Sequence, residues 1–206
     1  SRAYTHSYAN ESDLIPSGMR KETDSFEASL FEQIDGEIAL LSQRQGRTKF
    51  EKRISKLEAR KERLNTILTA IPDTMVKVVV PYTKRSPEDK RALRQNFAKS
   101  VRPSFLRHLV TSHLFAFLGK GVSLGQVWRM YQYGQAPEIA GRKMSIEHIY
   151  DLSGGGYNHY DNLCLMSEDI NGLKNNLIEW QTKDMRVGQT KDVLSFVPKG
   201  YEKRWR

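Results

Sequence analysis

The residue types best suited to hydrolytic chemistry gather in one stretch of the chain, residues 144–177. Glu147 and His148 are adjacent, Asn162 follows 14 positions after the histidine, and Asn171 comes 9 positions after that. A histidine with the ordinary pKa of about 6.5 can accept a proton from water at neutral pH. Carboxylate and side-chain amide oxygens are hard donors, which suit Mg²⁺ or Mn²⁺ better than Zn²⁺.

The local pattern predicts the elements that would position these side chains. Residues 146–149 are predicted to form a short strand, and Ser153 with three glycines after it predicts a loop. Residues 162–166 read as a second strand and 168–177 as a short helix. The expected order is therefore strand, glycine-rich loop, strand, helix.

This order, together with these residues, resembles the HNH (ββα-metal) endonuclease family. The version with Glu147-His148, then Asn162, then Asn171 followed by Lys174 is most similar to the HNH domain of RNA-guided CRISPR effector nucleases. It also resembles the nuclease domain of modification-dependent restriction enzymes. The resemblance covers about 35 residues, and we see no family pattern in residues 1–140.

The resemblance implies a role for each matched residue. His148 would be the general base, held through its other ring nitrogen by a backbone carbonyl. Glu147 and Asn171 would hold one divalent cation, Mg²⁺ or Mn²⁺, that acts as a Lewis acid on the scissile phosphate and supports the leaving 3′ oxygen. Asn162 would complete the catalytic set as a brace across the hairpin that fixes the loop beside His148.

Two further residues of this stretch are candidates for contact with nucleic acid. Lys174 shares a helix face with Asn171 and is a candidate phosphate contact, although a solvated helix lysine is the alternative. His159, in the loop before Asn162, could approach a phosphate or simply be exposed. Cys164 alternates with leucines on the second strand and is expected to be a small core residue.

The rest of the chain reads as mainly helical, so we expect an α+β protein. Three regions are predicted: a helical hairpin in residues 1–72, a basic and mainly helical region in 73–140, and the HNH module in 141–206. Residues 11–37 carry a net charge of −6 and residues 44–63 a net charge of +6. An acidic helix folded against a basic one explains this as a salt-bridged structural hairpin; a partner-docking arm in residues 20–71 and a basic helix laid along DNA are the alternatives.

The net charge of the whole chain is +9, and residues 73–140 supply 11 bases against 4 acids. Ser86-Pro87 followed by two acids is typical of a helix start. A basic surface binds phosphates without reading sequence. The residues expected to grip nucleic acid are Lys90, Arg91, Arg94, Lys99 and Arg102. DNA is favoured as the partner by the family resemblance alone, since nothing in the residues distinguishes DNA from RNA.

Composition narrows the class of protein. The chain has 206 residues and one cysteine, which excludes an internal disulfide framework and a cysteine-rich zinc site. No apolar run approaches 18 residues, so no transmembrane helix is expected. The N-terminus has no apolar segment of a secretory signal, and we expect a cytoplasmic protein.

The sequence therefore predicts a metal-dependent HNH endonuclease acting on DNA. One alternative is a nucleic-acid-binding module whose nuclease site is inactive. Another is an interaction module, docked through its hairpin on a larger defence, toxin or phage system. Restriction and other phage defence are among the settings that use such modules, and base-sequence or modification specificity is not readable from these residues.

Overall fold

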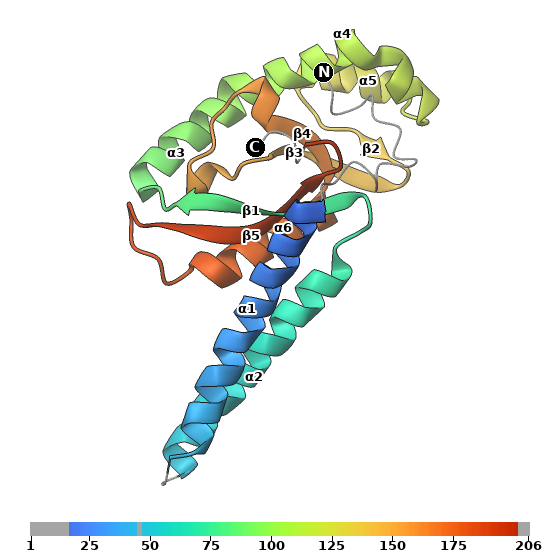
Figure 1. The fold of residues 1–206 in the computed structure, drawn as a ribbon. Helices are drawn as coiled ribbons and strands as arrows, with labels where there is room; N and C mark the ends of the chain where they lie inside the picture. The colour runs from blue at the N-terminus through green and yellow to red at the C-terminus, as the bar shows by residue number, and fades with distance from the viewer. Residues whose placement is uncertain (1–16, 45–46, 202–206) are drawn as a thin grey trace. The chain divides into compact units, whose positions relative to one another are not determined.

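The computed structural model describes residues 17–44 and 47–201, and the side chains of 22–44 and 49–201. The predicted α+β class is confirmed (Figure 1). No helix in the described part of the chain combines the length and the apolar character needed to cross a bilayer. In chain order the longer elements are α1 (Ser17–Ser42), α2 (Arg47–Ala70), β1 (Met75–Thr83), α3 (Pro87–Asn96), α4 (Arg102–Gly119), α5 (Leu124–Tyr133), β2 (Glu138–Ile139), β3 (Arg142–His148), β4 (Leu163–Ser167), α6 (Glu168–Thr182) and β5 (Thr190–Pro198).

The chain packs into two compact units. One contains residues 81–172 and 184–191, and the other contains the described residues up to 80 together with 173–183 and 192–201. The three regions predicted from the sequence do not coincide with these units, because C-terminal segments pack on N-terminal ones. Within the second unit, the Lys199 amide donates to the Thr74 carbonyl at 3.1 Å, and the Arg60 guanidinium lies 4.3 Å from the centre of the Trp180 ring.

Helices α1 and α2 lie side by side as the predicted hairpin (Figure 1). Arg53 on α2 pairs with Glu37 on α1 at 2.8 Å, and Lys61 pairs with Asp35 at 2.7 Å. The opposite charges of the two helices therefore meet across the hairpin. The apolar seam beneath them includes Ile34, Leu57, Leu64 and Ile67, all buried. The turn predicted at Gly46 and the capping box predicted at Thr48 lie outside the residues and side chains that the structure describes.

Helix α3 begins as predicted, and it ends at Asn96. The Ser86 hydroxyl accepts a hydrogen bond from the Asp89 amide at 3.2 Å, and Pro87 is at the start of the helix. After Asn96 the chain continues through a π-helical turn, Phe97–Val101, into α4. Pro103 is the second residue of α4, directly after the π-helical turn, so the proline lies at a distortion within a continuing helix.

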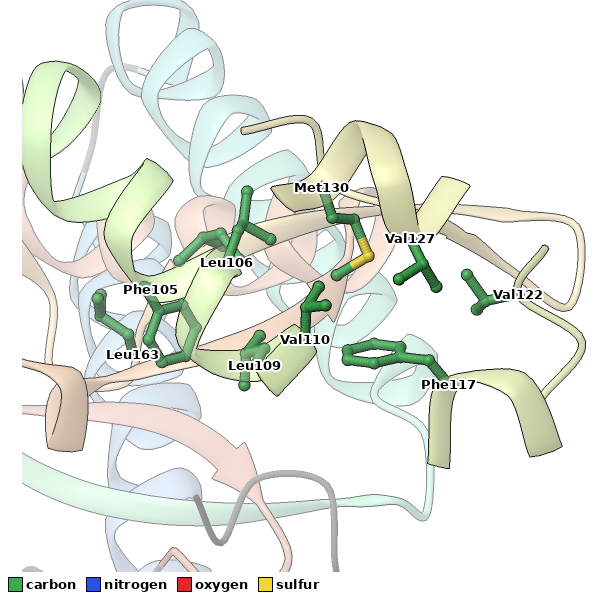
Figure 2. Close-up of a cluster of buried hydrophobic side chains, with 10 residues drawn as sticks. Phe105, Leu106, Leu109, Val110, Phe117, Val122, Val127, Met130 and Leu163 are labelled. Atoms are coloured by element: carbon green, nitrogen blue, oxygen red, sulfur yellow. The ribbon is translucent and has the colours of Figure 1, made fainter. Parts of the chain in front are cut away.

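The core of the first unit lies between α4, α5 and the β3–β4 hairpin (Figure 2). Ile146 of β3 and Leu163 of β4 pack into the same cluster as the helices. Helix α5 is fixed at both ends, because the Ser123 hydroxyl caps its first turn and Gly134 adopts a φ of 63° after its last residue. The other members of the cluster are Phe105, Leu106, Leu109, Val110 and Phe117 of α4, Val122 between the two helices, and Val127 and Met130 of α5.

The predicted strand, loop, strand, helix order is confirmed in residues 142–182. β3 and β4 pair in antiparallel fashion, with Glu147 opposite Cys164 and His148 opposite Leu163. β2 adds to the other side of β3, so the sheet order is β2-β3-β4. Cys164 is buried, as expected for a small core residue. β5, which pairs with β1, was not predicted from the sequence.

Candidate functional site

Glu147 and His148 end β3 and, as neighbours on a strand, point to opposite faces of the sheet. His148 shares its face with Ile146, which packs in the core against α4. The histidine ring lies 4.7 Å from the Phe97 ring, measured between centroids, and only 8% of the residue is exposed. The π-helical turn that carries Phe97 therefore forms one wall around the candidate base.

Asn158 holds one nitrogen of His148. The His148 Nε2 lies 2.8 Å from the Asn158 Oδ1, and the Asn158 Nδ2 donates to the Leu93 carbonyl at 2.8 Å. Because the amide nitrogen is directed to Leu93, its oxygen faces the histidine, and an oxygen accepts only from a protonated nitrogen. Nε2 therefore carries the proton in the neutral ring, and Nδ1 is the basic nitrogen. The anchor is a side-chain amide, where a backbone carbonyl was expected.

Asn162 braces the loop that joins the two strands, as predicted. Its Oδ1 accepts from the Tyr150 amide at 2.8 Å, and its Nδ2 donates to the carbonyls of Tyr150 and Tyr157, each at 3.0 Å. The Asn162 carbonyl also accepts from the Ile149 amide at 2.8 Å. One side chain thus ties both ends of the loop together directly after His148.

The glycines of this loop are required by close packing. A Cβ at Gly154 would lie 2.2 Å from the Tyr82 ring, and a Cβ at Gly156 would lie 1.9 Å from the Tyr150 carbonyl oxygen. The Arg85 guanidinium donates to the Gly156 carbonyl at 2.8 Å and so fixes the loop from the side of β1. The loop is therefore closed against its neighbours.

The two predicted metal ligands approach the same face of β3. The Asn171 amide nitrogen on α6 lies 3.4 Å from the Ser145 hydroxyl, and Ser145 is two residues before Glu147 on one face of the strand. Among the described residues, no three His, Cys, Asp or Glu side chains gather as a metal-binding group. One carboxylate and one amide oxygen are a donor set that fits Mg²⁺, which keeps several waters and is bound through few protein oxygens.

Lys174 and His159 differ in their surroundings. Lys174 is completely buried on α6, so it is not a solvated helix lysine, and in this structure it does not present its ammonium group to solvent. His159 is exposed in the loop, where its Nδ1 accepts from the Asp161 amide at 3.2 Å. His159 therefore caps the short turn before Asn162, and its ring remains accessible.

The basic residues predicted to grip nucleic acid lie at two places. Lys90, Arg91 and Arg94 line a groove along α3, and among the described residues none of the three makes an ion pair. Burial, and next the nearby Arg94, lowers the pKa of Lys90 below its usual value. Lys99 is exposed on the π-helical turn. Arg102 lies in a separate cleft together with Arg129 and Lys143. Arg129 and Lys143 were not predicted as binding residues from the sequence.

Residues that the sequence reasoning missed are those that support His148. Asn158 precedes His159 in the loop, but its anchor, the Leu93 carbonyl, is 65 positions away in the sequence. Phe97 likewise comes from a helix far from the motif. No local pattern connects these residues, since only the packing of α3 and the π-helical turn on the hairpin brings them together.

Comparisons of this chain with protein-family models, with curated proteins and with solved structures found no match. The residue types and their geometry are therefore the features of this chain that bear on its function. The residues that bear on it are the histidine fixed by Asn158, the loop braced by Asn162, and the oxygen donors Glu147 and Asn171.

Proposed function

We propose that this chain is a metal-dependent endonuclease that hydrolyses phosphodiester bonds in DNA, with His148 as the general base. The observation that carries the proposal is the hydrogen bond from the His148 Nε2 to Asn158, because it makes Nδ1 the basic nitrogen. The Asn162 brace supports it, since a general base acts efficiently only when it is held in place.

The remaining parts of the reaction are assigned to the two oxygen donors. Glu147 and Asn171 would hold one Mg²⁺ or Mn²⁺ at the end of β3. Since the strand stops at His148, a phosphate placed beyond its last residue would reach both the cation and the His148 ring. A cation bound there supplies Lewis-acid stabilisation of the charge that develops on the phosphate and on the leaving oxygen. His148 takes the proton from the attacking water, and Asn158 keeps the ring from rotating as charge develops on it.

DNA binding is assigned first to the groove along α3. Lys90, Arg91 and Arg94 lie within two turns of one helix, and among the described residues they make no ion pair. Such cations bind phosphates by releasing counterions, without reading the base sequence. DNA is preferred to RNA on the family resemblance described above.

A nucleic-acid-binding or interaction module without hydrolytic activity is the second candidate. The observation that favours it is the burial of His148, which is 8% exposed and packs against Phe97 as a structural histidine would. The two candidates differ in one measurable property, cleavage in the presence of a divalent cation.

The test is cleavage of supercoiled plasmid by the full chain in Mg²⁺, Mn²⁺ or Zn²⁺, beside the His148→Ala variant. A general base contributes about 10²–10⁴-fold to the rate, so His148→Ala should lose cleavage by that factor. His108→Ala is the control, because His108 stacks on Tyr160 and lies outside the proposed site. Equal cleavage by His148→Ala and the unmodified chain would reject the proposal, and absence of cleavage in all three metals would favour the second candidate.

The metal assignment has its own control on the same helix. Asn171→Ala should raise the Mg²⁺ concentration needed for half-maximal cleavage, and Glu147→Gln should do so more strongly, because it removes the only charged donor of the pair. Asn176→Ala, an exposed asparagine on α6, should leave the Mg²⁺ requirement unchanged. Identical Mg²⁺ curves for Asn171→Ala and Asn176→Ala would remove Asn171 from the site.

A further inference from the structure

A cleft of about 600 Å³ opens at the start of β3, away from His148. Its walls come from the first residue of α4, one flank of α5, the segment that leads into β2, and the first residue of α6. The volume lies in the range of pockets that bind small organic ligands. The side chains that define its chemistry are Arg102, Gln126, Arg129, Tyr133, Lys143 and Glu168.

Three cations face this cleft from three different elements. Arg102 comes from α4, Arg129 from α5 and Lys143 from β3, and none of them makes an ion pair with any acid in the described part of the chain. Two acids, Glu138 and Glu168, lie on the same walls, so the bases are in excess by one charge. Glu138 is the cross-strand neighbour of Lys143, and the remaining excess of cations on these walls favours an anionic ligand.

An aromatic ring completes the cleft. Tyr133 ends α5 and is 66% exposed, so its ring is accessible from the cleft. Gly134 follows Tyr133 in the left-handed conformation and reverses the chain after α5. The segment that leads into β2 is then fixed to α5, because the Gln126 Oε1 accepts a hydrogen bond from the Glu138 amide at 2.8 Å. An exposed tyrosine beside arginines is the arrangement on which unpaired bases stack.

We propose that this cleft binds one unpaired nucleotide of the nucleic-acid substrate, with its phosphate on Arg102, Arg129 and Lys143 and its base against Tyr133. The proposal rests on the proposed nuclease function and adds the part of the substrate that is gripped. An unpaired nucleotide is required because a base inside a duplex does not expose its face to a tyrosine ring.

The position of the cleft indicates which nucleotide it holds. Lys143 and His148 are five residues apart on β3, which corresponds to about 17 Å along an antiparallel strand at about 3.4 Å per residue. A stacked nucleic-acid strand advances about 3.4 Å per nucleotide, so this distance spans about five nucleotides. The cleft therefore binds a flanking nucleotide and not the scissile one, and the substrate carries an unpaired segment beside the cleavage point.

The other flank of α5 provides the matched control. Leu124, Trp128 and Tyr131 are exposed there, on a side of the helix that does not line the cleft. Trp128→Ala removes an exposed aromatic ring from the same helix as Tyr133. Lys183→Gln removes an exposed cation that is likewise absent from the cleft, and serves as the control for Lys143→Gln.

The test measures binding without cleavage, using full-length chains that all carry His148→Ala, in buffer without divalent cations. The probes are a fluorescent 12-nucleotide single strand, the same strand with abasic sites in place of its bases, and the matching duplex. Stacking predicts that Tyr133→Ala weakens binding of the single strand by about 5- to 150-fold, with little effect on the abasic strand or the duplex. Tyr133→Phe should bind as the parent does.

The cation substitutions report on the phosphate. Arg129→Gln and Lys143→Gln should each lower the slope of log binding constant against log salt by about 0.7 for the single strand. Lys183→Gln should leave that slope unchanged. Two results would overturn the nucleotide cleft. One is that Tyr133→Ala loses as much affinity for the abasic strand as for the intact strand. The other is that Tyr133→Ala and Trp128→Ala lose the same affinity for the intact strand.

The two proposals fail in different ways. If the chain cleaves plasmid with Mg²⁺ and the Tyr133 and Lys143 variants bind as the parent does, the nuclease stands and the cleft is refuted. If single-strand binding depends on Tyr133 and no cleavage is found, the cleft stands as a nucleotide site and the hydrolytic role of His148 is refuted.

Discussion

The two ends of β3 present opposite kinds of site. At the His148 end the side chains are buried, and the loop is held by Asn162 and by glycines that leave no room for a Cβ. At the Lys143 end the cations and Tyr133 are accessible around an open cleft. The difference matches the demands of the two tasks, since proton transfer needs fixed geometry, whereas phosphate binding works with solvated cations on flexible side chains.

The comparison separates two kinetic quantities. Changes at the closed end should lower the rate of cleavage at saturating substrate and leave the binding constant nearly unchanged. Changes at the open end and along α3 should weaken binding and alter its salt dependence, with little effect on the saturated rate.

Gly156→Ala should be the most damaging single change at the closed end. The new Cβ would lie 1.9 Å from the Tyr150 carbonyl oxygen, and backbone there must move. We expect loss of cleavage and a decrease of about 1–3 kcal/mol in the free energy of unfolding, measured by urea titration. Gly172→Ala is the control, because nothing lies within 4 Å of a Cβ at that position. A stable Gly156→Ala chain would show that the loop is not closed.

Asn158→Ala should reduce the saturated rate by about 10- to 100-fold, the range found for residues that orient a catalytic ligand. The variant removes the acceptor that holds Nε2 of His148, so the pH profile of the rate should also change shape. Asn158→Asp retains an acceptor oxygen and should recover part of the rate. A purely structural role would instead lower stability and leave the pH profile of the remaining activity unchanged.

Charge reversal of Lys90, Arg91 and Arg94 should weaken DNA binding and reduce the salt slope by up to about 2.7, which is about 0.9 for each lost phosphate contact. The catalytic site should remain intact, so the rate at saturating DNA should be close to that of the parent. The same reversal at Lys52, Lys56 and Arg63, exposed on α2, is the matched comparison. If both variants show the same slope of the log binding constant against log salt concentration, the phosphate contacts are not confined to α3.

Stability should rise slightly at alkaline pH through Lys90. Burial lowers the pKa of Lys90 in the folded chain, so its charge costs stability at neutral pH. Between that lowered pKa and the usual value of 10.5 the unfolded chain binds more protons, and the free energy of unfolding therefore increases with pH in this window. Lys90→Gln should flatten the increase seen in urea titrations, whereas Lys99→Gln should retain it.

The sequence predicted the elements around the motif because their signals are local. Ser86-Pro87 marked the start of α3, and the glycine run marked the loop. The role of Asn162 as a brace was also predicted, and its three hydrogen bonds confirm it as a structural role. The roles of His148, Glu147 and Asn171 in catalysis stay predictions.

What the sequence did not predict depends on contacts between distant residues. Three such features arise from segments that meet only in the folded chain. They are the pairing of β5 with β1, the hydrogen bond between Asn158 and His148, and the complete burial of Lys174. The cleft was missed for the same reason. Arg102 was predicted to bind nucleic acid, but no pattern connects it with Arg129 and Lys143. Only the fold places the three around one cavity.

The π-helical turn Phe97–Val101 sets the angular phase between α3 and α4. Its hydrogen bond from the Arg102 amide to the Phe97 carbonyl spans one residue more than an α-helical bond. Deleting a single residue within the turn would rotate α3 by about 100° relative to α4. That deletion would redirect Lys90, Arg91 and Arg94 and withdraw Phe97 from His148 without changing any of these side chains. A length change of one codon is therefore the smallest mutation that would uncouple the basic groove from the candidate base.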